Sequence, residues 1–251
     1  MNVQRDFISV VIAFYNGAPH VKESIESALG QTHGHIEVIV VVDDSKEGSL
    51  AVVEDLAKRD NRLKVVSQRN RGISAARNRG LEVARGEFIA FLDAADYWAP
   101  ECLEKLHRAL AASDAVLAYC GWQNMGVSGG ISDPFVPRDH SGGNNVEKLL
   151  KGRRWPVHAA LIQREAVEGA GGFDERWILC ADYGLWLKVV SGNTIVSVPE
   201  ILAFHRYHDG QTIKNRSQIA KCHWRIRREF IKHRPEIAKH LGHRRIRDLV
   251  H

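Results

Sequence analysis

The chain of 251 residues has few cysteines and lacks several patterns that mark other classes of protein. Its four cysteines are widely separated and form no C-x-x-C pair, which argues against a zinc site or redox dithiol and favours buried, reduced thiols. No apolar run reaches about 18 residues, and the N-terminus lacks the apolar core of a signal peptide, so the sequence predicts a cytoplasmic protein. Neither a G-x-x-x-x-G-K-[ST] loop nor a G-x-G-x-x-G turn after the first strand is present, which argues against P-loop NTPases and nicotinamide dehydrogenases.

The positive charge of the chain is concentrated at its carboxyl end. The net charge is +5, yet residues 214–251 alone contain 12 Lys and Arg residues against three acids. An apolar stripe at helical spacing in this stretch, formed by Ile219, Cys222, Ile226 and Phe230, predicts an amphipathic helix. Such a helix either lies on an anionic membrane surface, here the inner face, or packs its stripe against the body of the protein. No zinc-finger or RNA-recognition signature is present, so no nucleic-acid partner is expected.

Short apolar, β-branched runs alternate with helical patterns before Pro100, which is typical of βαβ units and a mostly parallel sheet. The predicted strands are Ile8–Ala13, Ile36–Val42, Leu63–Val66 and Phe88–Leu92, and the predicted helices are Pro19–Leu29, 50–57 and Ile73–Ala84. The pattern after Pro100 is less regular. It predicts helices at Glu101–Ala112, Asp182–Val190 and Gln211–His233 (stopped by Pro235), strands at Ala115–Cys120, His158–Gln163 and Thr194–Val198 (broken at Pro199), and a loop or hairpin at Gly126–Gly143.

Polar residues follow three of the predicted strands. Asn16 follows the first strand, Asp43 and Asp44 end the second, and Asp93 and Asp96 follow the fourth. The carboxyl ends of parallel strands meet at one edge of the sheet, where open α/β proteins bind their ligands. Carboxylates there can accept hydrogen bonds from a base or ribose, or hold a divalent cation. The alternative is that each acid caps the helix that follows it, but three converging strand ends favour a binding site.

Eight segments share an order and spacing that point to a known family: Ser9–Asn16, Ser24–Thr32, Glu37–Asp44, Asn70–Gly80, Gly86–Asp93, Gly171–Glu175, Asp182–Lys188 and His205–His208. Together they resemble the family 2 glycosyltransferases, which have the GT-A fold, an α/β architecture with a Rossmann-like, mostly parallel sheet flanked by helices. The resemblance implies a GT-A domain over residues 1–213, divided into a nucleotide-binding half (1–98) and an acceptor-side half (99–213). A basic helical extension over 214–251 completes the expected organisation.

The resemblance also implies where a nucleotide-sugar donor binds. Asp44 matches the residue that binds the base of the nucleotide, and Tyr15 and Arg77 shape that pocket. Ala13, at the end of the first strand, belongs to the same nucleotide site, and Asp93 is expected to contact the ribose.

Glycosyl transfer requires a base that takes the proton of the acceptor hydroxyl. The resemblance places Asp182 in this role, at the start of a helix; the alternative is that Asp182 is only the N-cap of that helix. With one base and direct displacement, the anomeric configuration inverts. The expected partners are a nucleotide-sugar donor, with a UDP-sugar favoured, and a glycan, lipid-linked or small-molecule acceptor.

The expected metal site departs from the family pattern. Relatives commonly carry D-x-D-D after the fourth strand, whereas this chain has Ala95 in place of the usual acidic ligand. We expect Mg²⁺ or Mn²⁺ to be held by Asp93 or Asp96 together with His208. The alternatives are that Asp96 is only an N-cap of the helix after Pro100 and that His208 is only a polar loop residue. Without such a metal site, either basic side chains neutralise the diphosphate, or the chain is a non-catalytic nucleotide-sugar-binding or partner subunit that lost metal chemistry at Ala95.

Overall fold

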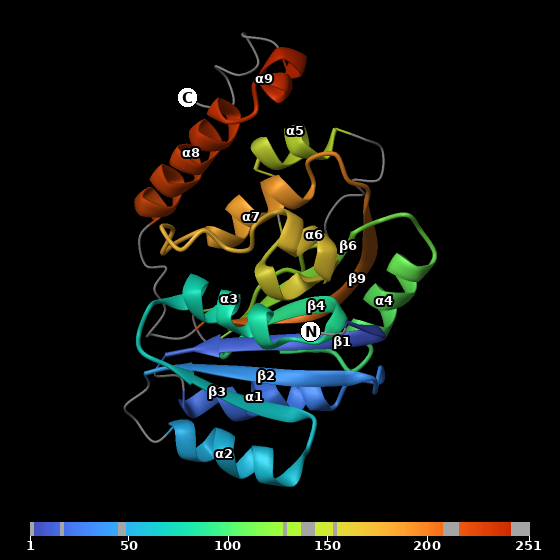
Figure 1. Ribbon diagram of the computed structural model, residues 1–251, viewed down its shortest axis with the longest axis vertical. Coiled ribbons are helices and arrows are strands. Elements are labelled where there is room, and N and C mark those ends of the chain that lie inside the picture. Colours follow the sequence, from blue (N-terminus) through green and yellow to red (C-terminus); the bar gives the residue numbers. More distant parts are fainter. Residues whose placement is uncertain are drawn as a thin grey trace.

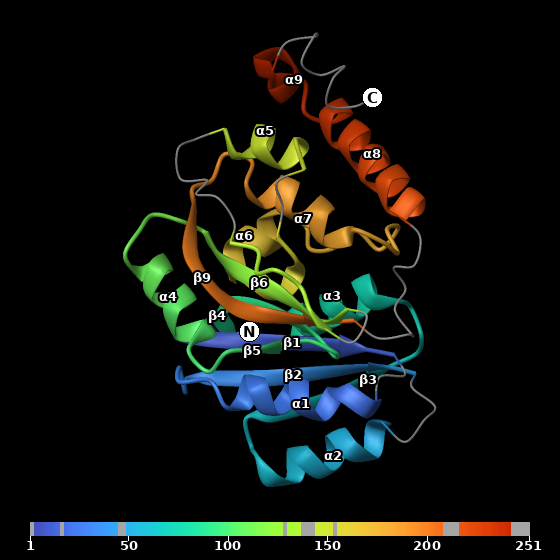
Figure 2. The ribbon, with the colours of Figure 1, turned by 180° about the vertical axis from the view of Figure 1, so that it is seen from behind.

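The computed structural model describes residues 3–15, 18–44, 49–127, 130–136, 144–152, 155–207 and 216–241. Within these residues a nine-stranded sheet runs in the order β3-β2-β1-β4-β8-β6-β9-β5, with β7 paired to β6. Helices α1 and α2 lie on one side of the β1–β3 region, and α3, α6 and α7 lie on the other (Figures 1 and 2). The predicted α/β fold with a mostly parallel sheet flanked by helices is confirmed.

The first four strands form the parallel part of the sheet, and their composition explains their burial. They are β1 (Gln4–Phe14), β2 (Ile36–Asp43), β3 (Leu63–Gln68) and β4 (Gly86–Asp93). All eight residues of β2 are buried, as expected for a strand covered by helices on both faces. The helices that connect and follow these strands are α1 (Ala18–Leu29), α2 (Ser49–Arg59), α3 (Ile73–Val83) and α4 (Cys102–Ala111).

The second half of the chain extends the same sheet with mixed pairing. Strand β8 (Ala160–Gln163) pairs antiparallel with both β4 and β6 (Leu117–Val127), whereas β9 (Ile195–Arg206) pairs parallel with β6. The short strands β5 (Tyr97–Trp98) and β7 (Gly130–Ile131) pair with β9 and β6. The remaining elements before residue 207 are α5 (Asn145–Leu150), the 3-10 helix η1 (Val157–Ala159), α6 (Arg164–Gly169) and α7 (Ala181–Val189).

Of two predictions that depended on proline, the one at Pro199 is wrong. The predicted break at Pro199 is instead a bulge inside β9, where the register shifts from Val198 opposite Cys120 to Ile201 opposite Gly121. Proline has no N–H to donate to a neighbouring strand, and at a bulge one residue is left out of the hydrogen-bond ladder, so no such donor is required there. Pro235 does follow the end of α8 (Arg216–Lys232), but it also opens a further helix, α9 (Pro235–Leu241), at a position where proline is favoured.

Helix α8 packs its apolar stripe against α7. Ile226 and Phe230 are buried, and Ile226 lies 3.7 Å from the position that a Cβ on Gly184 would take. Arg227 Nε donates to the hydroxyl of Tyr183 at 3.0 Å. The packed-stripe alternative is therefore the arrangement in the described part of α8. No helix in the described residues is long and apolar enough to cross a membrane.

Candidate functional site

The strand register brings the predicted donor-site residues to one edge of the sheet. Ala13 pairs with Asp93 of β4, and on its other side it pairs with Val41 of β2. Tyr15 and Asp44 directly follow β1 and β2, and both are exposed. Asp44 adopts a left-handed backbone conformation (φ 56°), which aspartate tolerates better than most residues. The predicted convergence of strand ends is therefore present in the structure.

The two adjacent carboxylates at the carboxyl end of β2 differ in role, and Asp43 is the one that stabilises the fold. Its side chain is buried and accepts hydrogen bonds from the backbone N–H groups of Arg71 (3.0 Å) and Gly72 (2.9 Å) and from Gln68 Nε2 (2.8 Å). Asp43 thus fixes the loop that leads into α3. Asp44 is left exposed at the edge, where a ligand can reach it.

Arg77 and Asp93, both predicted at the donor site, form an ion pair. Arg77 Nη2 lies 2.5 Å from Asp93 Oδ1, and the Arg77 side chain is nearly buried while that of Asp93 is 39% exposed. The guanidinium carbon of Arg77 lies 5.1 Å from the ring centroid of Phe173, a cation–π contact. Arg77 therefore orients the Asp93 carboxylate and ties it to the segment that precedes α7.

That segment is bound to α3 by a second set of contacts. Asn78 accepts a hydrogen bond from the backbone N–H of Phe173 and donates one to its carbonyl oxygen, both at 2.9 Å. Ser74 Oγ donates to the carbonyl oxygen of Trp177 at 3.0 Å. Gly172 has φ +65°, and a Cβ there would lie 2.8 Å from Asn78 Oδ1, so only glycine fits. These contacts bind the Asn70–Gly80 segment to the segment that contains Gly171–Glu175.

Asp182 is the second residue of α7 and follows the segment that is bound to α3. The N-cap position is occupied by Cys180, so the alternative that Asp182 is the N-cap is wrong. Asp182 Oδ1 accepts a hydrogen bond from the backbone N–H of Tyr183 at 2.8 Å, which holds the carboxylate at the positive end of the helix. The segment before α7 lies on the same side of the molecule as the carboxyl ends of β1 and β2 (Figures 1 and 2). The role of Asp182 as a base stays a prediction.

Asp96 lies in a tight turn, where its backbone N–H donates to the carbonyl oxygen of Asp93 at 2.9 Å. Its buried carboxylate is 2.9 Å from Nδ1 of His158 and 3.1 Å from Nδ1 of His205, and it accepts the backbone N–H of Arg206 at 2.9 Å. We call Asp96, His158 and His205 the Asp96 cluster. The alternative of an N-cap is wrong for Asp96 too, because α4 begins after Glu101.

Within the Asp96 cluster, the surroundings of Asp96 and His205 favour the charged forms of these two residues despite burial. Burial alone would raise the pKa of Asp96, but the charges and hydrogen bonds of His158 and His205 outweigh it and hold that pKa below its usual value. Burial would likewise lower the pKa of His205, yet the hydrogen bond and charge of Asp96 raise it. Opposite charges in one buried cluster thus stabilise each other.

The residues that surround the predicted metal position fit a cation only in part. Ala95 offers no ligand atom, Asp93 is held by Arg77, and His208 lies outside the described residues. The Asp96 cluster has a donor set that could hold a metal ion, with one ligand atom from each residue, all within 4.8 Å of one another. The sequence pattern named Asp96 but missed His158 and His205, because their convergence depends on the pairing of distant strands.

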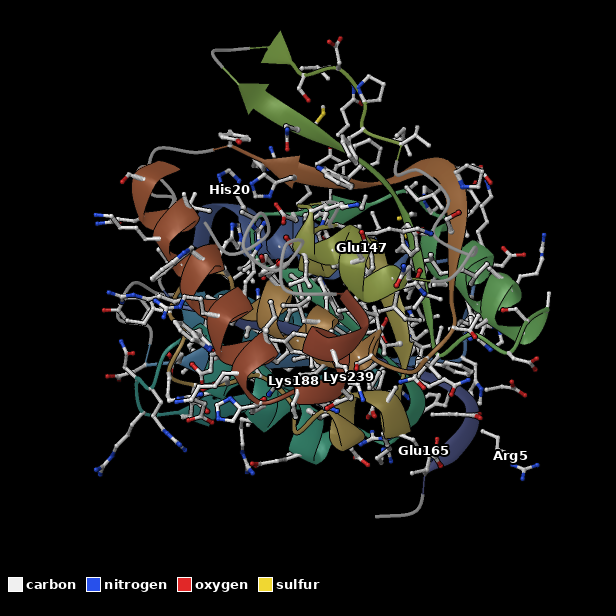
Figure 3. The ribbon with its side chains drawn as sticks, turned by 90° about the horizontal axis from the view of Figure 1, so that it is seen from above. Arg5, His20, Glu147, Glu165, Lys188 and Lys239 are labelled. Carbon is white, nitrogen blue, oxygen red and sulfur yellow. The ribbon has the colours of Figure 1, made fainter. Side chains whose placement is uncertain are left out.

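A separate cavity of about 650 Å³ lies between α6, α7 and α8. Its lining includes Glu165 and Lys188, which are labelled in Figure 3, and Val116 and Asn193, which precede β6 and β9. The predicted donor-site residues other than Arg77 instead lie at the carboxyl ends of β1, β2 and β4, so the cavity is distinct from that edge of the sheet. Of the four cysteines, all free, Cys102 and Cys120 are buried as predicted, whereas Cys180 and Cys222 are only partly buried.

The open α/β sheet with carboxylates and an arginine at its carboxyl edge defines a class of ligand-binding α/β protein. The sequence model of the family described as Glycosyl transferase family 2 matches residues 9–168. The chain therefore belongs to glycosyl transferase family 2, as the motifs predicted, and it has the GT-A fold.

Relatives by sequence agree with this assignment. TuaG of Bacillus subtilis, named as a glycosyltransferase of teichuronic acid biosynthesis, is 29% identical over 228 residues, which cover 90% of this chain and 89% of TuaG. EpsH of Bacillus subtilis, also named as a glycosyltransferase, is 41% identical over 115 residues. That match covers 46% of this chain and only 33% of EpsH, so the chain aligns with about a third of that relative.

Solved structures with the same fold carry bound nucleotides. The S. aureus TarS fragment 1–349 in complex with UDP-GlcNAc has a TM-score of 0.73 at 19% identity, covering 90% of this chain and 66% of that one. The mannosyltransferase PcManGT of Pyrobaculum calidifontis, in complex with GDP-Man and Mn²⁺, has a TM-score of 0.65 at 22% identity. This match covers 88% of this chain and 64% of PcManGT. At these identities the likeness shows the fold.

Proposed function

We propose that this chain is an inverting glycosyltransferase that uses a nucleotide-diphosphate sugar, with a UDP-sugar favoured, and a hydroxyl of a glycan, lipid-linked or small-molecule acceptor. The observation that carries the proposal is the Arg77–Asp93 pair at the carboxyl edge of the sheet, in a chain whose family match spans that edge. Exposed Tyr15 and Asp44 lie at the same edge and are available to the base. The UDP complexes of TarS support the choice of nucleotide.

In the proposed reaction Asp182 takes the proton of the acceptor hydroxyl as its oxygen attacks the anomeric carbon. The bond from that carbon to the diphosphate breaks, and the configuration inverts. Asp44 binds the base, Asp93 the ribose, and Arg77 keeps the Asp93 carboxylate in place. A divalent cation, when bound, supplies positive charge to the leaving diphosphate.

The deciding measurement is hydrolysis or transfer of a panel of nucleotide-diphosphate sugars by wild-type protein and by Asp182→Asn. We expect the variant to lose about 10²–10⁴-fold in rate, the size of a general-base contribution. Its affinity for UDP, measured by calorimetry, should stay within about twofold, because a remote base does not contact the nucleotide. Asp114→Asn is the matched control, since Asp114 is an exposed residue outside the proposed site.

Near wild-type turnover in Asp182→Asn would remove Asp182 from the proposal. If the wild type binds UDP but turns over no donor with any acceptor tested, the non-catalytic nucleotide-sugar-binding subunit becomes the better description. In that case Ala95 would account for the loss of metal chemistry, because the resemblance to the family implies an acid at this position.

A further inference from the structure

The Asp96 cluster has the spacing of a coordination site. The Nδ1 atoms of His158 and His205 lie 2.9 and 3.1 Å from the Asp96 carboxylate, and the three ligand atoms are all within 4.8 Å of one another. In an octahedral site with bonds of about 2.1 Å, adjacent ligand atoms are about 3.0 Å apart and opposite ones about 4.2 Å apart. The separations of Asp96 from His158 and from His205 match those of adjacent ligand atoms in such a site.

The surroundings hold these three side chains in place. Asp96 and His158 are each 1% exposed, and Arg206 donates its backbone N–H to the Asp96 carboxylate. The backbone of His158 is held by the indole of Trp98, whose Nε1 donates to the His158 carbonyl oxygen at 2.6 Å. The rings of His158 and His205 are parallel, 5.7 Å between centroids. Such supporting contacts are what orients the ligands of a metal site.

We propose that Asp96, His158 and His205 bind one transition-metal ion and select Co²⁺, Zn²⁺ or Mn²⁺ over Mg²⁺. Two of the three donors are imidazole nitrogens, which transition metals accept as ligands, Mn²⁺ least strongly and Co²⁺ and Zn²⁺ more so, whereas Mg²⁺ prefers oxygen ligands. The inference deepens the proposed function and rests on it only for the role of the ion. His205 lies close enough to Asp93 for their charges to interact, so the site adjoins the expected donor edge. The cluster would thus replace the ligand that is missing at Ala95.

The site is tested by metal binding in the absence of any nucleotide. The full chain is stripped with a chelator and titrated separately with Co²⁺, Zn²⁺, Mn²⁺ and Mg²⁺, while melting temperature and Co²⁺ absorption are recorded. We expect saturation at one Co²⁺ per chain with the visible absorption of a nitrogen-bound ion. We also expect thermal stabilisation by Co²⁺, Zn²⁺ and Mn²⁺ that Mg²⁺ at the same concentration does not give.

Three variants assign the binding to the cluster. His205→Asn and His158→Asn should lose the metal-dependent shift, whereas His233→Asn, a histidine just after α8 and outside the cluster, should keep it. The comparison is between metal-free and metal-loaded samples of the same variant, so a loss of basal stability does not obscure the result. An undiminished shift in His205→Asn, or an equal shift with Mg²⁺, would overturn the proposal. Metal binding without turnover of any donor would instead count against the proposed function alone.

Discussion

The two halves of the sheet place their functional residues by different means. In the first half, the proposed donor-site residues are adjacent because β1, β2 and β4 are neighbouring parallel strands, and the register alone sets Ala13 beside Asp93. In the second half, His158 and His205 come from η1 and β9, elements that meet only through the pairing of β8, β6 and β9. The first arrangement follows from local sequence, and the second depends on the assembled fold.

Besides the pairing of β4 with β8, the two halves are joined by a small set of polar contacts on α3, which we call the α3 junction. Asn78 and Ser74 bind the backbone of the segment before α7, and Arg77 stacks on Phe173 of that segment. The residue proposed to bind the donor and the residue proposed to act as the base are therefore linked through one helix. Disturbing this junction should affect both halves, whereas disturbing the far edge of the sheet should affect stability alone.

Asn78→Ala should have the largest effect on stability. The substitution removes the hydrogen-bond partners of the N–H and the carbonyl oxygen of Phe173. Each unsatisfied buried group lowers the free energy of unfolding by about 1–3 kcal/mol, so we expect a total loss of about 3 kcal/mol. Urea denaturation measures the loss. Donor turnover should fall further than UDP affinity, because the segment leading to Asp182 loses its anchor.

The control for Asn78→Ala is Arg79→Ala, on the same helix. Arg79 pairs only with Glu82 among the contacts described, and both side chains are about half exposed. Such a pair contributes less than about 1 kcal/mol. Equal losses of stability in the two variants would show that the junction does not hold the halves together.

Glu37→Gln tests the amino-terminal ends of the parallel strands, away from the proposed donor site. We expect it to lower the free energy of unfolding by about 2 kcal/mol. Glu37 is buried and accepts hydrogen bonds from Ser9 Oγ, Arg85 N and Lys64 Nζ, each at 2.7 Å. The amide cannot satisfy these donors as the carboxylate does. Because the donor edge lies at the other ends of β1 and β2, turnover per folded molecule should be unchanged.

The pH dependence of that cost has a definite sign. Burial would raise the pKa of Glu37, but the bonds from Lys64, Ser9 and Arg85 outweigh it and lower the pKa below its usual 4.5. A lowered folded pKa means that the carboxylate stabilises the fold above pH 4.5 and loses this contribution as the pH falls through the folded value. The difference in unfolding free energy between wild type and Glu37→Gln should therefore shrink below pH 4.5. A difference that grows on acidification would contradict this assignment.

The same contrast between halves explains what the sequence could predict. Apolar periodicity located β1 to β4 and the acids that follow them, because buried parallel strands are marked by continuous β-branched runs. It did not separate the roles of Asp43 and Asp44, since both follow the same strand and only the loop over Arg71 and Gly72 distinguishes them.

In the second half, local patterns were weaker guides. The elements β5, α5 and α6 were missed because each is six residues or shorter and offers too few positions for a period to show. The short strand β7, in contrast, forms a hairpin with β6 within the segment Gly126–Gly143, where a loop or hairpin was predicted. The motif that contains His205 pointed to its neighbour His208, and nothing in the sequence indicates that Asp96 reaches His205. Only the pairing of β5 with β9 brings them together.

Gly172→Ala should destabilise the protein less than Asn78→Ala does. We expect it to lower the free energy of unfolding by about 1–2 kcal/mol more than Gly171→Ala does. Both glycines have positive φ, +65° and +76°, so both substitutions carry the same kind of backbone strain. Only the Cβ at Gly172 would meet Asn78 Oδ1, at 2.8 Å, whereas a Cβ at Gly171 meets nothing within 4 Å. The difference in unfolding free energy between the two variants isolates the clash, and equal values would refute it.

The smallest effect that we predict is the binding of the basic helix α8 to membranes. Its stripe residues Ile226 and Phe230 are buried, so they are not available to insert into lipid, and the exposed cations are left to act by charge alone. Sedimentation with anionic vesicles should show binding at low salt that disappears near physiological salt, and none with neutral vesicles. Trp224→Ala, which removes a 37% exposed aromatic side chain stacked on Arg228, should leave this unchanged. Salt-resistant binding to neutral vesicles would mean that α8 leaves α7 to expose its stripe, and the basic extension would then be a membrane anchor.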